Sequence, residues 1–147
     1  MYRRILLAYD GSSFSAEALR EGTELASLCH AELHILCVVD RSGGFALAEG
    51  AASGSLSEEE ILEAQRALQE ALAAVRSAGV TAASSLRFGN PATEIRACAR
   101  EVQADLVVIG HGGKGMVTRW LQGSVGVALV DHLPCSLLVA VPAGGER

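Results

Sequence analysis

A cluster of glycines near the carboxyl end of the chain has the spacing of a phosphate-binding loop. Gly110, Gly113, Gly123 and Ser124 form a G-x2-G-x9-G-S pattern that begins where the apolar run of residues 105–109 ends. Glycine lets a polyanion approach the main chain closely because it has no Cβ atom. Ser124 adds a hydroxyl and the free N–H groups of a predicted helix start, which attract phosphate. This pattern makes nucleotide binding the first hypothesis.

A carboxylate after the first apolar run supplies a second group with binding chemistry. Asp10 follows residues 4–9, and it would face Gly110 across the crevice if the first and fourth strands were neighbours in a parallel sheet. A carboxylate there accepts hydrogen bonds from the exocyclic amine of a base or from ribose hydroxyls, whereas it repels phosphate. We therefore assign Asp10 to the nucleoside end. A capping role before Ser12 is equally open and is compatible with binding.

Short apolar runs, which alternate with longer amphipathic ones, must position these groups. The predicted strands are residues 4–9, 33–39, 80–87, 106–109 and 136–141. Between them, Ser12 or Ser13 caps a helix that runs to about Cys29, and a capping box at residues 57–60 opens a helix that Gly79 ends. Asn90 and Pro91 start a helix to about Gln103, and residues 125–132 form the last one.

This alternation predicts a doubly wound α/β sandwich with a five-stranded parallel sheet. We expect a single domain over residues 1–147, with a core of Val, Leu, Ile and Ala, because half of the residues are apolar and only 4% are aromatic. The segment from Arg41 to Ser55 is rich in Gly, Ala and Ser and is predicted to be a long loop, of the kind that is usually a functional lid or disordered.

Charge and composition narrow the classes of partner. The net charge is −5 and no cluster of Lys and Arg occurs, which argues against nucleic acid and anionic membrane surfaces. No apolar run approaches the ~20 residues that a membrane span needs, and no signal peptide is visible. The four cysteines form no CxxC pair, which favours free thiols in a reducing cytoplasm. We expect a cytoplasmic protein.

Four segments together resemble the universal stress protein family. They are Ala-Tyr-Asp-Gly-Ser at residues 8–12, Val-Val-Asp at 38–40, Gly-Asn-Pro at 89–91, and the glycine motif with Ser124 and Val125. They occur in order and with matching spacing over essentially the whole chain. The resemblance implies an adenine-nucleotide alpha-hydrolase-like α/β fold with strand order 3-2-1-4-5, helices on both faces and, in one subgroup, an ATP site.

The resemblance also implies a role for each matched residue. Asp10 and the backbone of Val38 would lie at adenine, and Ala8 and Gly110 would lie against the ribose. Mg²⁺ or Mn²⁺ would bridge the phosphate oxygens. The residues around the phosphates would be Gly113, Gly123, Ser124 and Val125. The implied function is that of a stress-response protein in which ATP binding serves a sensor or regulatory module.

Two other functions stay open. An ATPase or phosphotransferase needs a positioned base or a water-orienting group, and only His111 lies beside the predicted phosphates, so we expect slow hydrolysis at most. An interaction module without nucleotide is the other alternative, because relatives often have a basic residue where this chain has Gly112. The segment from Gly110 to Gly115 also matches a dinucleotide fingerprint, but too little chain follows it for that site.

The last predicted strand, from Ser136 to Val141, is expected at an edge of the sheet. An apolar exposed edge favours pairing with another chain. We therefore expect a two-fold homodimer joined antiparallel along this strand, an arrangement that the family also implies.

Overall fold

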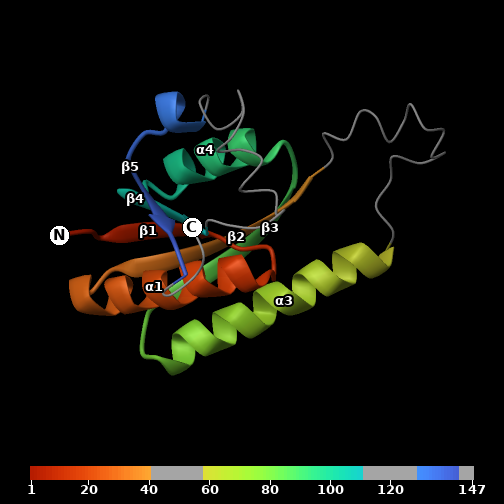
Figure 1. Cartoon of the computed structure of the whole chain (residues 1–147), viewed down its shortest axis with the longest axis horizontal. Coiled ribbons are helices and arrows are strands. Elements are labelled where there is room, and N and C mark those ends of the chain that lie inside the picture. Colours follow the sequence, from red (N-terminus) through yellow and green to blue (C-terminus); the bar gives the residue numbers. More distant parts are fainter. Residues whose placement is uncertain (41–57, 111–128, 143–147) are drawn as a thin grey trace.

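The computed structural model describes residues 1–40, 58–110 and 129–142 (Figure 1). The predicted loop from Arg41 to Ser55, the predicted cap at Ser57 and most of the last predicted helix lie outside the described residues. Of that helix, residues 129–132 are helical. Within the described ranges, no helix is long and apolar enough to span a membrane.

The described residues form a five-stranded sheet in the order β3-β2-β1-β4-β5, and every neighbouring pair is parallel. The strands are β1 (Arg4–Ala8), β2 (Glu32–Asp40), β3 (Ala82–Gly89), β4 (Leu106–Gly110) and β5 (Ser136–Ala140). The helices are α1 (Ser13–Cys29), α3 (Glu58–Ser77) and α4 (Pro91–Glu101). The predicted doubly wound α/β fold and its strand order are therefore confirmed.

The helix starts follow the predicted caps. Ser12, not Ser13, caps α1, and its side chain accepts a hydrogen bond from the Ser15 amide. Asn90 caps α4 in the same way, with Pro91 at the first helical position. The helix α4 ends earlier than predicted because Gln103 has a φ of 56°, in the left-handed region.

The sheet lies between α4 on one side and α1 and α3 on the other (Figure 1), and each of its faces carries an apolar layer. Ile5 and Leu7 of β1 pack with α1 and α3 on one face, while Leu6 and Ala8 pack with α4 on the other. Successive side chains of a strand point to opposite faces, so a strand covered on both sides must be apolar throughout. This explains why the central strands read as continuous apolar runs.

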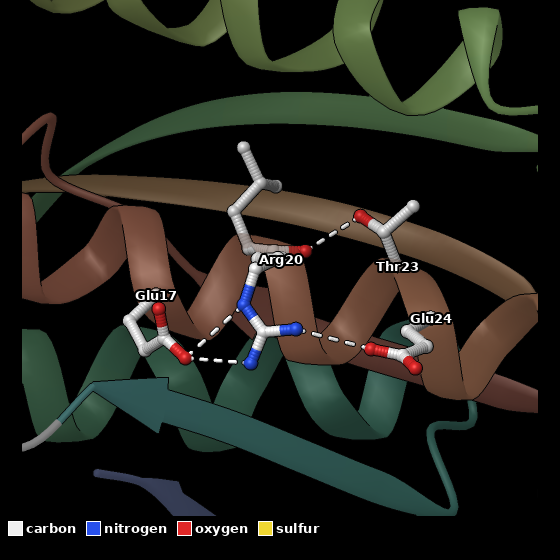
Figure 2. A network of polar contacts seen from close by, with 5 residues as sticks. Glu17, Arg20, Thr23 and Glu24 are labelled. Carbon is white, nitrogen blue, oxygen red and sulfur yellow. Dashed lines mark hydrogen bonds and ion pairs between the residues drawn. The ribbon is translucent and has the colours of Figure 1, made fainter. Parts of the chain in front are cut away.

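The outward face of α1 carries a short charge network (Figure 2). Arg20 donates to Glu17 at 2.7 Å and to Glu24 at 3.1 Å, and Thr23 donates its hydroxyl to the Leu19 carbonyl at 2.6 Å. The hydrogen bond from Arg20 holds the pKa of Glu17 below its usual value. The two ion pairs of Arg20 lie one turn or more beyond the start of α1, and they favour a regular helix there.

A carboxylate joins β1 to β4 at the amino edge of the sheet. Asp105, just before β4, accepts hydrogen bonds from the amides of Arg3 at 2.8 Å and Arg4 at 3.1 Å. The Asp105 amide returns a bond to the Arg4 carbonyl at 2.9 Å. The two central strands are therefore held in register at the end opposite to the predicted nucleotide site.

We predict that Asp105→Ala lowers the free energy of unfolding by about 1–3 kcal/mol, because two main-chain amides lose their acceptor. Urea unfolding followed by circular dichroism measures this. The control is Glu32→Ala at the same edge, which removes only an exposed ion pair with Arg4 of 3.9 Å and should change stability by less than about 1 kcal/mol. Equal losses in the two variants would contradict a special role for Asp105.

Candidate functional site

The carboxyl ends of β1, β2 and β4 meet at one edge of the sheet. Ala8 of β1 is in register with Leu36 of β2, and Leu7 of β1 is in register with Val108 of β4. The chain runs outward from β1 through β2 to β3 and then continues at β4 on the other side. The β1–β4 junction is thus the point where strand order reverses, which is where open α/β sheets bind ligands.

Four of the sequence-predicted residues lie at this edge. Ala8 ends β1, Asp10 follows it, Val38 lies near the end of β2, and Gly110 ends β4. The other four predicted residues lie outside the described residues, and they are Gly113, Gly123, Ser124 and Val125. The described part of the site is therefore the part assigned to adenine and ribose.

Asp10 presents an exposed carboxylate from a tight turn. Its Oδ1 atom accepts a hydrogen bond from the Ser12 amide at 2.9 Å, and its own amide donates to Ser15 Oγ at 3.3 Å. Gly11 between them has a φ of 82°, which favours glycine, and a Cβ there would lie 3.5 Å from the Cβ of Ala67 in α3. The turn thus fixes one carboxylate oxygen and leaves Asp10 accessible to solvent.

Main-chain groups of Val38 lie beyond the end of β1. The Tyr9 amide donates to the Leu36 carbonyl at 2.8 Å, which is the last β1–β2 ladder bond in the described part of the chain. β2 continues past it to Asp40. Val38, two residues after Leu36, directs its N–H and C=O to the same side. Its side chain is buried against α4, so a ligand could contact this residue only through its main chain.

Gly110 is in direct contact with the first turn of α1. A Cβ at Gly110 would lie 2.3 Å from the carbonyl oxygen of Phe14 and 2.8 Å from its carbonyl carbon. No side chain fits there unless the helix moves. The helix contact therefore accounts for this glycine, independently of the ribose contact that the resemblance implies.

The side chains of Tyr9 and Cys37, which lie beside Asp10 at this edge, are kept neutral by burial and by nearby charge. Burial, together with the charge of Asp10, raises the pKa of the Cys37 thiol to about 11. The pKa of Tyr9 is also raised, first by burial and then by Asp10, Glu70 and Cys37. Both groups are uncharged at neutral pH. This part of the edge therefore suits hydrogen-bond donors, such as an amine or ribose hydroxyls, better than phosphate.

Metal ligands are not gathered in the described part of the chain. No group of three or more His, Cys, Asp or Glu residues within it is placed to hold a metal ion. The predicted Mg²⁺ or Mn²⁺ would be held by phosphate oxygens, so its position stays a prediction.

Sequence reasoning missed two residues that shape this edge. Ser15 holds the Asp10 amide from the first turn of α1, and the Phe14 carbonyl excludes any side chain at Gly110. The signal for Ser15 is a second serine three positions after the cap, where a hydroxyl can reach back to the preceding turn. The Phe14 contact has no local signal, because it joins residues far apart in the chain.

Comparison with known proteins identifies the family to which this fold belongs. The model of the universal stress protein family matches residues 1–141. Universal stress protein MJ0531 of Methanocaldococcus jannaschii is 32% identical over 139 residues, which cover 95% of this chain and 82% of that protein. The chain therefore belongs to the universal stress protein family.

Solved structures agree with this assignment. A universal stress protein family structure from Burkholderia pseudomallei is 29% identical, with a TM-score of 0.68 and coverage of 94% of this chain and 95% of that one. The universal stress protein of Archaeoglobus fulgidus in complex with dAMP is 26% identical, with a TM-score of 0.68 and coverage of 94% and 97%. At least one relative thus binds an adenine nucleotide. That a single domain spans residues 1–147 stays a prediction.

We predict that Gly110→Ala lowers the free energy of unfolding by about 1–3 kcal/mol, because the added Cβ meets the main chain of Phe14, which cannot rotate away. Thermal unfolding measures this. The control is Gly22→Ala in α1, where the added Cβ would lie 2.6 Å from a terminal methyl of Leu7 that can change rotamer. A Gly110→Ala protein as stable as wild type would contradict the close contact.

Proposed function

We propose that this chain is an ATP-binding universal stress protein that acts as a nucleotide-dependent sensor or regulatory module. The observation that carries the proposal is the pairing of two features at the strand-order reversal. One is the exposed carboxylate of Asp10, and the other is the main chain of Val38 beyond the end of β1. Family membership and the dAMP complex of the Archaeoglobus fulgidus relative support an adenine nucleotide.

In this proposal the adenine lies between Asp10 and Val38. The free oxygen of Asp10 accepts from the exocyclic amine, and the Val38 N–H and C=O contact the ring edge. The ribose lies beside Ala8 and Gly110. The phosphates, with Mg²⁺ or Mn²⁺, occupy the Gly110-x2-Gly113-x9-Gly123-Ser124-Val125 segment, whose glycine spacing supports an anion site.

We also propose that the protein works in the cytoplasm. All four cysteines carry free thiols, two of them buried. Free thiols are typical of a reducing compartment. The Cys37 thiol lies at the candidate site and is held in its protonated form.

The test of the function is the affinity for Mg-ATP, measured by titration calorimetry. We expect Asp10→Ala to weaken binding by on the order of tenfold or more, because a charged hydrogen bond is lost. Gly123→Val should weaken it further, because a branched side chain blocks the phosphates. The control is Asp131→Ala, which removes an exposed carboxylate that precedes the opposite, amino end of β5. Unchanged affinity in both site variants would contradict the proposal.

A two-fold homodimer through β5 is the second part of the proposal. The strand β5 has β4 as its neighbour on one side and lies at the edge of the sheet. Leu137, Leu138 and Val139 are half-buried, and Val141 just beyond the strand is 46% exposed. An apolar edge with unpaired main-chain groups favours antiparallel pairing with a second copy.

Light scattering coupled to gel filtration tests the dimer. We expect the wild-type protein at micromolar concentration to have twice the mass of one chain. Val141→Lys should shift it toward the monomer, because a charge then enters the apolar edge. The control is Leu62→Lys, which changes a side chain 57% exposed on α3, away from β5. A monomeric wild-type protein would refute this arrangement.

A further inference from the structure

Ser15 is the only buried polar side chain among the residues that the structure describes, with 4% of its surface exposed. A buried hydroxyl is costly unless it is hydrogen-bonded. Ser15 Oγ accepts from the Asp10 amide at 3.3 Å and donates to the Ser12 carbonyl at 3.0 Å, and it lies 3.4 Å from Ser12 Oγ. The hydroxyl is therefore fully used within one turn.

Together with the Asp10 carboxylate, Ser12 and Ser15 form a ring of hydrogen bonds. The Ser15 amide donates to Ser12 Oγ at 3.2 Å, and the Ser12 amide donates to Asp10 Oδ1 at 2.9 Å. The main chain of Asp10 is thus held by Ser15, and its carboxylate is held by Ser12. With one carboxylate oxygen engaged, the other has a defined direction.

The same turn is fixed from the other side by β4. A Cβ at Gly110 would lie 2.3 Å from the Phe14 carbonyl oxygen and 3.2 Å from the Ser15 amide nitrogen. The first turn of α1 is therefore packed between the end of β4 and the Asp10 turn. Ser15 Oγ is the atom through which this packed turn reaches the Asp10 main chain.

We propose that Ser15 is a positioning residue for the nucleoside end of the site. It contacts no ligand in this proposal, but it sets the direction of the Asp10 carboxylate relative to β4. Because the inference deepens the proposed function, it rests on adenine-nucleotide binding at this edge.

The main experiment is calorimetry of Ser15→Ala with adenosine and with Mg-ATP. We expect both affinities to fall by the same factor, on the order of tenfold, because the hydroxyl supports the nucleoside end and not the phosphates. Ser15→Cys keeps the shape of the side chain, slightly enlarged, but replaces the oxygen with a weak acceptor, and it should bind as weakly as Ser15→Ala. Ser27→Ala, an exposed serine in the last turn of the same helix, should bind like wild type.

A double-mutant cycle separates positioning from a general loss of structure. If Ser15 acts through Asp10, Ser15→Ala should cause no further loss of adenosine affinity in an Asp10→Ala background. Amide hydrogen exchange gives a readout without ligand. The Asp10 amide should exchange faster in Ser15→Ala and Ser15→Cys, while amides of β2 keep their protection.

The outcomes distinguish the two proposals. A wild-type protein that binds neither adenosine nor Mg-ATP refutes the proposed function, and this inference falls with it. A wild-type protein that binds both, with Ser15→Ala or Ser15→Cys unchanged, refutes only the inference. If Ser15→Ala lowers the adenosine affinity as much in the Asp10→Ala background as in the wild-type protein, the inference is also refuted. If Ser15→Ala does not fold, Ser15→Cys and its Asp10 amide exchange decide the question.

Discussion

The contact between the Phe14 carbonyl and Gly110 is the constraint on which the carboxyl edge of the sheet depends. It brings the main chain of a helix against the main chain of a strand, and only glycine allows this distance. Once α1 starts there, Ser12 and Ser15 lie directly beside Asp10. The helix start, the strand end and the carboxylate are then joined by close packing and hydrogen bonds. The geometry around Asp10 therefore follows from packing and hydrogen bonds within the chain.

The site divides along the chain into parts with different chemistry. The part built by β1 and β2 offers a carboxylate and main-chain groups, and it has neutral neighbours in Tyr9 and Cys37. The part proposed for phosphate is the glycine motif that follows β4 in the sequence, most of which lies outside the described residues. A carboxylate and a polyanion repel each other, so in the proposed function a single nucleotide must keep its phosphates away from Asp10 while its base contacts that residue.

Local patterns explain most of what the sequence predicts correctly. The strands were predicted from apolar runs, and the start of α4 was predicted from Asn90 with Pro91. Both signals depend only on residues that are neighbours in the sequence. The choice of Ser12 over Ser13, the burial of Ser15 and the Asp105 bonds were not predictable in this way. They depend on which surfaces pack together. The prediction that Asp10 and Gly110 lie at the same edge of the sheet is correct. The contact between Gly110 and the first turn of α1 could not be predicted, because it depends on how the helix packs on the sheet.

The protonated thiol of Cys37 has a consequence for chemical damage. Peroxides and electrophiles attack the thiolate, and a pKa of about 11 leaves on the order of one molecule in ten thousand in that form at pH 7. Burial first, and the charge of Asp10 second, keep the proton on the sulfur and so lower its reactivity toward oxidants.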